Sequence, residues 1–137
     1  KKFDSKIIPT KNNALNQDDK YPKAKRIDSI IEVCSSVSSN VSGALKKHQF
    51  PFVLSSDHSG AIGTISGIKA ANPSLRLGVI WIDAHADLHS PYTTPTGNVH
   101  GMSLMASLNQ DNSERRAHEL DHLTNQQWEK LKKLDNI

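Results

Sequence analysis

The spacing of hydrophobic residues predicts helices that alternate with short extended segments. In residues 23–48 apolar side chains recur every three or four positions, as expected for an amphipathic helix. A second helix is predicted over residues 60–71, which end at Asn72 and Pro73. Residues 77–82 are continuously apolar and too few for a helix, so they predict a buried parallel strand.

A short strand is also predicted at residues 52–55, just before the 60–71 helix. Strand, helix and strand with short joints form a βαβ unit, whose crossover should be right-handed. The fold class expected from this pattern is therefore α/β with a mainly parallel sheet. The polar N-terminal residues 1–22 predict a loop with one short extended piece at residues 3–8.

The chain after residue 83 is predicted to be a long loop followed by helices. Residues 84–99 form a connection longer than most compact domains use, and such loops are usually functional. A helix is expected over residues 100–108 and a polar linker over residues 110–119. Thr124 followed by Gln127 matches a capping box, which predicts a last helix through Leu134.

Composition narrows the classes of partner. The 17 Lys and Arg residues are scattered against 14 Asp and Glu, and aromatic residues are few, which argues against nucleic-acid binding. No apolar run has the length of a membrane span. The single Cys34 excludes an intramolecular disulfide framework and fits a reducing compartment, so we expect a cytoplasmic protein with Cys34 buried on a helix face.

Histidine and aspartate gather where the two predicted strands end. Asp83, His85 and Asp87 follow the second strand at alternate positions, and His58 follows the first. Side chains at the carboxyl ends of neighbouring parallel strands can share a ligand. Mixed nitrogen and oxygen donors suit Mn, Fe, Co or Zn, and bridging carboxylates favour a pair of ions. These residues predict a metal site that could activate a water molecule for hydrolysis.

Two alternatives stay open for these polar residues. Asp57 and Asp83 could instead cap the segments that follow them, with His58 and His85 as structural histidines. A separate motif at residues 118–122 reads His-Glu-Leu-Asp-His and matches the zinc metalloprotease pattern H-E-x-x-H. Its polar surroundings and the helix cap expected at Thr124 favour a solvated turn.

Two stretches carry a family resemblance. Residues 81–102, WIDAHADLHSPYTTPTGNVHGM, resemble the signature of the ureohydrolase superfamily, arginase in particular, and residues 55–67, SSDHSGAIGTISG, resemble its upstream metal motif. The resemblance implies a three-layer α/β/α fold with a mainly parallel sheet. It also implies hydrolysis of a guanidino group to urea with two Mn²⁺, which hold an ionised water.

The resemblance also implies roles for individual residues. His58 would bind one ion and His85 the other, while Asp83 and Asp87 would bridge them. His100 would match the family's proton-shuttling histidine. Three loop residues would contact the substrate: Thr96, Asn98 and His89, the last in a position where arginases commonly carry an Asn that binds the substrate carboxylate.

The resemblance covers only part of such an enzyme. Residues 1–137 would form part of a single arginase-like domain with its motif core at residues 50–108. The family's first strand and its C-terminal half, with a later Asp-x-Asp strand, have no match. The expected substrate is L-arginine, with agmatine or formimidoylglutamate as alternatives, and the full-length enzyme is expected to be a homo-oligomer. A further alternative is a catalytically incomplete segment that acts as a structural or partner-binding module.

Overall fold

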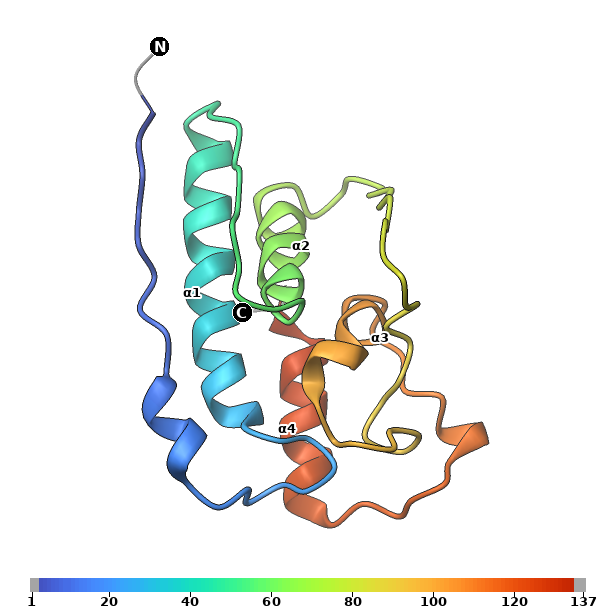
Figure 1. Ribbon diagram of the computed structural model, residues 1–137. Coiled ribbons are helices and arrows are strands. Elements are labelled where there is room, and N and C mark those ends of the chain that lie inside the picture. The colour runs from blue at the N-terminus through green and yellow to red at the C-terminus, as the bar shows by residue number, and fades with distance from the viewer. Residues whose placement is uncertain (1–2, 135–137) are drawn as a thin grey trace.

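The computed structural model describes residues 3–134 as helices joined by long irregular segments. Helices α1 and α2 lie side by side, and α4 packs beside the N-terminal half of α1 (Figure 1). None of the helices in the described part of the chain is both long and apolar enough to cross a bilayer. The elements are η1 (Asn12–Asn16), α1 (Ile27–Lys46), α2 (Gly60–Ala71), η2 (Val99–Met102), α3 (Ser103–Ser107), η3 (Ser113–Arg115) and α4 (His122–Lys132).

Helix α1 confirms the predicted amphipathic helix with slightly narrower bounds. Its apolar stripe is buried, and this stripe includes Ile31 and Cys34. The helix begins at Ile27 rather than at residue 23, because a turn precedes it. In this turn the Ala24 amide donates to the Tyr21 carbonyl at 2.9 Å. It ends at Lys46, and His48 then takes a left-handed conformation with φ of 56°.

Helix α2 confirms the second predicted helix and packs on α1 at unusually short range. A Cβ atom on Gly63 would lie 2.5 Å from the Cys34 carbonyl oxygen, and one on Gly67 would lie 2.6 Å from that of Ser38. Glycine therefore allows the two backbones to approach in a way that no larger residue would. The Cys34 thiol also donates to the Ser59 carbonyl at 3.1 Å, which ties the start of α2 to α1.

The hydrophobic core lies where α1, α4 and the η2–α3 region meet. Trp128 from α4 is fully buried there, beside Ile27 and Ile31 of α1 and Met102 of η2. The core therefore holds the C-terminal half of the chain against the two paired helices.

The two predicted strands are not formed within the described residues. Residues 52–55 and 77–82 are extended but pair with no neighbour, so the structure contains no βαβ ladder there. The expectation of a buried strand is also wrong, because Ile80 is 90% and Ile82 92% exposed. A strand exists only when a neighbouring strand takes up its backbone hydrogen bonds, and the described chain offers none.

The C-terminal expectations are confirmed in part. The helix expected at residues 100–108 is split into η2 and the shorter α3, and the linker at 110–119 contains η3. The cap predicted at Thr124 is wrong: α4 begins at His122 and is capped by Asp121, whose carboxylate accepts from the Thr124 amide at 2.7 Å.

Candidate metal site

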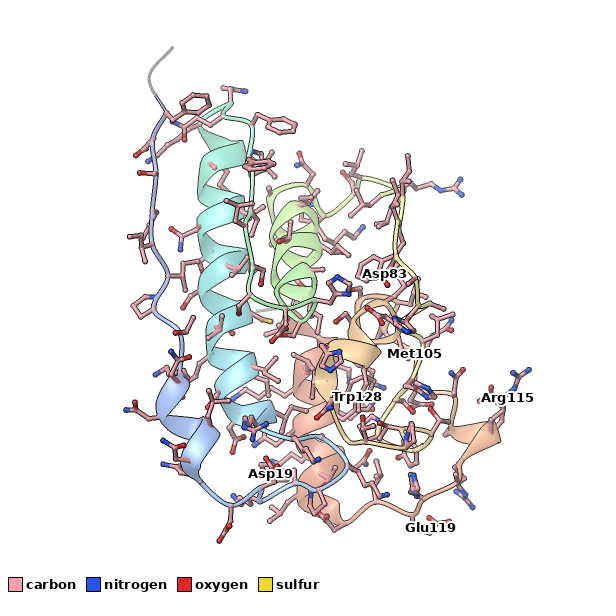
Figure 2. All side chains as sticks on the ribbon, in the orientation of Figure 1. Asp19, Asp83, Met105, Arg115, Glu119 and Trp128 are labelled. Carbon is pink, nitrogen blue, oxygen red and sulfur yellow. The ribbon has the colours of Figure 1, made fainter. Side chains whose placement is uncertain are left out.

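Three of the four residues expected to bind metal, His58, Asp83 and Asp87, come together, and the fourth, His85, does not join them. His58 Nδ1 lies 2.8 Å from Asp83 Oδ2 and 3.0 Å from Asp87 Oδ2. Donor atoms from the three residues all lie within 4.8 Å of one another. Figure 2 shows Asp83 on the segment that descends from α2 towards α3. Residues far apart in the chain thus present one nitrogen and two oxygen donors to one point.

Backbone hydrogen bonds from α3 position Asp87. The Leu104 and Met105 amides, in the first turn of that helix, both donate to the Asp87 carbonyl at 3.2 Å. Asp87 has a left-handed φ of 51°, a conformation that aspartate tolerates better than most residues. Its side chain, only 6% exposed, is held facing His58.

The two carboxylate oxygens of Asp83 make different contacts, one with the backbone of the following turn and the other with His58. Oδ1 accepts from the His85 amide at 2.7 Å, which is the capping role considered as the alternative. Oδ2 faces His58, and the side chain is 9% exposed. The His85 ring is different: it is 85% exposed, and its Nδ1 lies 3.6 Å from Asp83 Oδ1, outside the three-residue group.

His58 is held at the start of α2 by its neighbours on both sides. Asp57 Oδ1 accepts from the Ser59 amide at 2.8 Å, so Asp57 does serve as a local cap. The edge of the His58 ring meets Trp81, with centroids 6.0 Å apart and planes at 77°. Sequence reasoning missed Trp81, although its position two residues before Asp83 places it on the same side of an extended chain.

The three donors fit a divalent cation. Two nearly buried carboxylates repel each other, and a positive charge between them relieves that repulsion. The His58 imidazole adds a nitrogen donor, and a mixed nitrogen and oxygen set suits Mn²⁺ or its neighbours better than Ca²⁺. The group could therefore hold one ion, whereas His85 faces solvent beside it.

The residues expected to contact the substrate lie on the following loop. Thr96 and Asn98 belong to one turn, in which the Asn98 amide donates to Thr96 Oγ1 at 3.2 Å. His89 Nδ1 lies 3.3 Å from Thr93 Oγ1 on the exposed side of the loop. His100 is exposed in η2, and its carbonyl accepts from Ser103 Oγ at 2.9 Å. The structure thus gathers these residues on one segment but outside the His58 group.

The H-E-x-x-H motif does not form a zinc site. Only His122 lies in α4, so the two histidines do not share a helical face. His118 Nε2 is engaged with the Thr94 carbonyl at 2.7 Å. The zinc metalloprotease alternative is therefore wrong.

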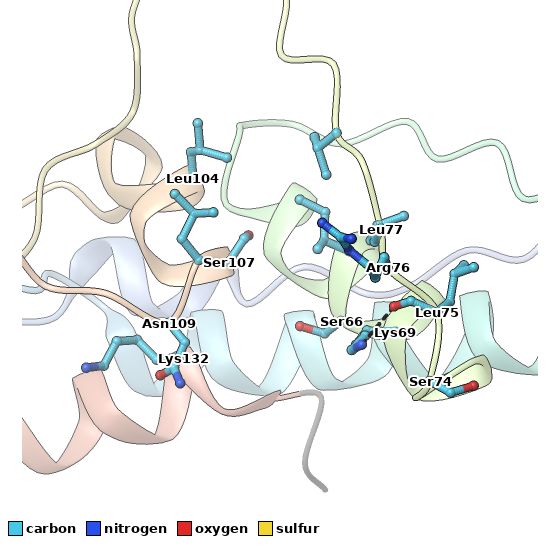
Figure 3. A pocket seen from close by; sticks show the side chains of 13 residues that line it. Ser66, Lys69, Ser74, Leu75, Arg76, Leu77, Leu104, Ser107, Asn109 and Lys132 are labelled. Atoms are coloured by element: carbon cyan, nitrogen blue, oxygen red, sulfur yellow. Dashed lines mark hydrogen bonds between the residues drawn. The ribbon is translucent and has the colours of Figure 1, made fainter.

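Two hollows flank α2. One, of about 810 Å³, is lined by the two extended segments and by α2, and its lining residues include Thr64, Ile68 and His58. The other, of about 650 Å³, lies between α2, α3 and residues 74–79 (Figure 3). The cationic Lys69 in this second hollow donates to the Pro73 and Leu75 carbonyls at 2.7 and 2.9 Å. Only the first hollow reaches the metal-ligand candidates.

Known proteins resemble this chain in sequence and in structure. Residues 8–128 match the Arginase family. Arginase from Bacillus caldovelox is 42% identical over 63% of this chain and 28% of its own length, and arginase from Saccharomyces cerevisiae is 43% identical over 65% and 27%. The crystal structure of Bacillus cereus arginase matches with a TM-score of 0.62 at 44% identity, covering 67% of this chain and 31% of that one.

The chain belongs to the arginase family, because the family match covers most of its length. It spans less than a third of the curated arginases that it resembles. The likeness to solved arginases extends over about two thirds of the chain, so the helices and extended segments correspond to part of the arginase fold. The arrangement in the described residues is therefore that of an incomplete α/β domain.

Proposed function

We propose that this chain carries part of the active site of a Mn²⁺-dependent hydrolase that releases urea from a guanidino compound, with L-arginine as the substrate and L-ornithine as the second product. The observation that supports this most directly is the convergence of His58, Asp83 and Asp87 in a chain of the arginase family. A related protein, the Entamoeba histolytica arginase, was solved in complex with L-ornithine and is 28% identical, with a TM-score of 0.59 over 76% of this chain and 37% of that one.

Asp83 and Asp87 would bridge the ions, His58 would bind one of them and His85 the other. Donor atoms of His58 and the two carboxylates already lie close together, and the exposed His85 ring lies beside them with its Nδ1 3.6 Å from Asp83 Oδ1. A complete site would hold two ions, with further ligands that residues 3–134 do not bring to this group. Bound divalent ions lower the pKa of water and so supply a nucleophile near neutral pH.

The loop after the metal group would bind the rest of the substrate. Thr96 and Asn98 offer hydroxyl and amide groups to the α-amino and α-carboxylate groups of an amino acid, with His89 beside them. His100, which is exposed, would pass a proton to the departing amine, because an imidazole can both take up and release a proton. The enzyme in its full length would be a homo-oligomer.

Metal titration with matched variants tests the metal group. Mn²⁺ binding, followed by calorimetry or by the electron paramagnetic resonance signal of free Mn²⁺, should weaken at least about tenfold in Asp83→Ala and Asp87→Ala, because even supporting residues commonly contribute that much. Asp57→Ala is the control, since Asp57 is a nearby carboxylate outside the group. Equal Mn²⁺ affinity in all three variants would contradict the proposed ligand set.

Urea release tests the reaction. L-arginine, agmatine, guanidinobutyrate and formimidoylglutamate should be compared, because His89 leaves the recognition of a carboxylate open. Urea from L-arginine at a rate that depends on Mn²⁺ supports the arginase proposal. Preference for agmatine would instead indicate the agmatinase branch of the superfamily, and an Asp83→Ala variant with full activity would contradict a bridging role.

A second candidate function is that of a structural or partner-binding module. The exposed side chains of Ile80 and Ile82 favour it, because exposed apolar residues often mark a surface that binds a partner. In an active enzyme of this family, these residues would be expected to lie covered in the sheet. Binding of Mn²⁺ at a single weak site, together with no urea from any of these substrates, would support the module and exclude independent catalysis by this chain.

A further inference from the structure

The loop of residues 90–98 is anchored by two segments that are distant in sequence. His118 Nε2 lies 2.7 Å from the Thr94 carbonyl oxygen, and the Lys25 amide donates to the Gly97 carbonyl at 2.8 Å. The Ala117 and His118 amides both donate to the Tyr92 carbonyl, at 2.8 and 3.1 Å. The loop is therefore fixed from outside at three points rather than by its own turns alone.

The contact between His118 and Thr94 indicates that the Nε2 atom of the ring is a hydrogen-bond donor. A backbone carbonyl can only accept, so the 2.7 Å contact with Thr94 requires Nε2 to be protonated and to donate. Lys23 Nζ also lies 3.3 Å from Nε2, but an ammonium can only donate and so cannot form a hydrogen bond with a protonated nitrogen. The hydrogen bond to Thr94 is thus the interaction through which His118 acts on the loop.

Thr94 passes this constraint to the residues expected to bind substrate. Its side chain is buried, and its Oγ1 accepts from the Gly97 amide at 2.9 Å and from the Thr96 amide at 3.3 Å. Thr96 Oγ1 in turn accepts from the Asn98 amide at 3.2 Å. The His118 ring is therefore connected to the amides of Thr96 and Asn98 by hydrogen bonds that are joined through the covalent structure of Thr94 and Thr96.

Gly97 makes the turn possible. Its φ of 77° is in the left-handed region, and a Cβ atom there would lie 2.0 Å from the Pro22 carbonyl oxygen. The turn before α1 thus packs directly against the loop. Movement of the loop at Gly97 would require movement of residues 22–25 as well, so the contact makes the loop rigid.

We propose that His118 is a positioning residue that holds the loop of residues 90–98 in the shape needed to recognise the carboxylate end of an amino-acid substrate. The proposal rests on the proposed function only for the identity of that ligand, because the hydrogen bonds themselves are structural observations. His118 acts through Thr94 and touches no substrate. His118, which belongs to an apparent zinc motif in the sequence, is thus assigned the role of holding the loop of residues 90–98.

Amide hydrogen exchange tests the positioning role without any need for catalysis. His118→Leu keeps a bulky side chain but removes the donor, whereas His118→Gln restores an N–H that can reach a carbonyl. We expect exchange of the Gly97 and Lys25 amides to rise roughly threefold to tenfold in His118→Leu and to return most of the way in His118→Gln, as the loss of one hydrogen bond predicts. His122→Ala, which removes the other histidine of the motif, should change neither amide.

Kinetics with two substrates test the link to recognition. In His118→Leu the KM for L-arginine should rise roughly threefold to tenfold with little change in kcat. The KM for agmatine, which lacks the carboxylate, should stay unchanged. An equal rise for both substrates would overturn the proposal, and so would wild-type exchange in His118→Leu or a failure of His118→Gln to restore protection. If amide protection is lost in His118→Leu and recovered in His118→Gln, but the protein releases no urea, the positioning role stands and the proposed function is contradicted.

Discussion

The paired helices and the two extended segments carry similar apolar residues, yet only the helices bury them. Ile31 of α1 is 4% exposed, whereas Ile80 in the second extended segment is 90% exposed. A helix satisfies its backbone hydrogen bonds internally and needs only one covered face. A strand needs neighbours along its edges as well as cover above and below. The same hydrophobicity in the sequence therefore leads to burial in one region and exposure in the other.

The most damaging change should be in the core beneath the helices. Trp128→Ala removes the largest fully buried side chain and should lower the free energy of unfolding by about 3–5 kcal/mol. Chemical denaturation would measure this. Leu123→Ala, on the exposed side of the same helix, is the control and should cost no more than about 0.5 kcal/mol.

A methyl group at the contact between α1 and α2 should be nearly as disruptive. Gly63→Ala places a Cβ atom 2.5 Å from the Cys34 carbonyl, and the helices must separate to accept it, at a cost of about 1–3 kcal/mol. Gly43→Ala is the matched control, because nothing lies within 4 Å of its Cβ position. It should stabilise α1 by about 0.5–1 kcal/mol. Similar melting temperatures for the two variants would show that the close approach is unimportant.

The cap of α4 should contribute a smaller, pH-dependent effect. Hydrogen bonds from the Thr124 amide and hydroxyl lower the pKa of Asp121. A carboxyl whose pKa is lower in the folded state stabilises the fold at pH values above its unfolded pKa of about 3.9. Asp121→Ala should therefore lower the melting temperature at pH 7, by less than Gly63→Ala does. The difference from the wild type should shrink as the pH falls below 4, and a constant difference would contradict an ionic cap.

The smallest effect is expected in the extended segment. Ile80→Ser removes a large apolar side chain that the described chain does not cover, so stability should change by no more than about 0.5 kcal/mol. Ile31→Ala, in the helical region, should cost about 2–5 kcal/mol. A large loss for Ile80→Ser would mean that the segment is buried in solution and that the contrast between the two regions does not hold.

Local patterns predicted the helices well and the strands poorly. Residues 60–71 form α2 as expected, because a helix is defined by contacts within one stretch of sequence. The polar residues after the apolar run were correctly expected to include Asp83 and Asp87 near His58, but strand-like alternation does not explain it, because Asp87 has a left-handed φ of 51° and His85 lies outside the group. Strand pairing could not be predicted in the same way, since it depends on partners elsewhere in the fold.

The details that sequence patterns missed all depend on competition between neighbouring groups or on long-range contacts. Thr124 matched a capping box, yet Asp121 stands three residues earlier and its carboxylate is the stronger acceptor for the Thr124 amide. His118 was expected to lie in a solvated turn, and nothing nearby in the sequence indicated that its ring would reach Thr94, 24 positions away. The metal-ligand roles of His58, Asp83, His85 and Asp87 remain predictions, and so do the roles expected for His89, Thr96, Asn98 and His100.

The buried thiol at the contact between α1 and α2 makes unfolding directly visible. Burial raises the pKa of Cys34 to about 12, so the reactive thiolate is scarce at neutral pH in the native protein. Alkylating reagents should modify this single cysteine only when the two helices separate. The rate of labelling would then report how often the segment that carries His58 comes loose, with no added probe and no engineered residue.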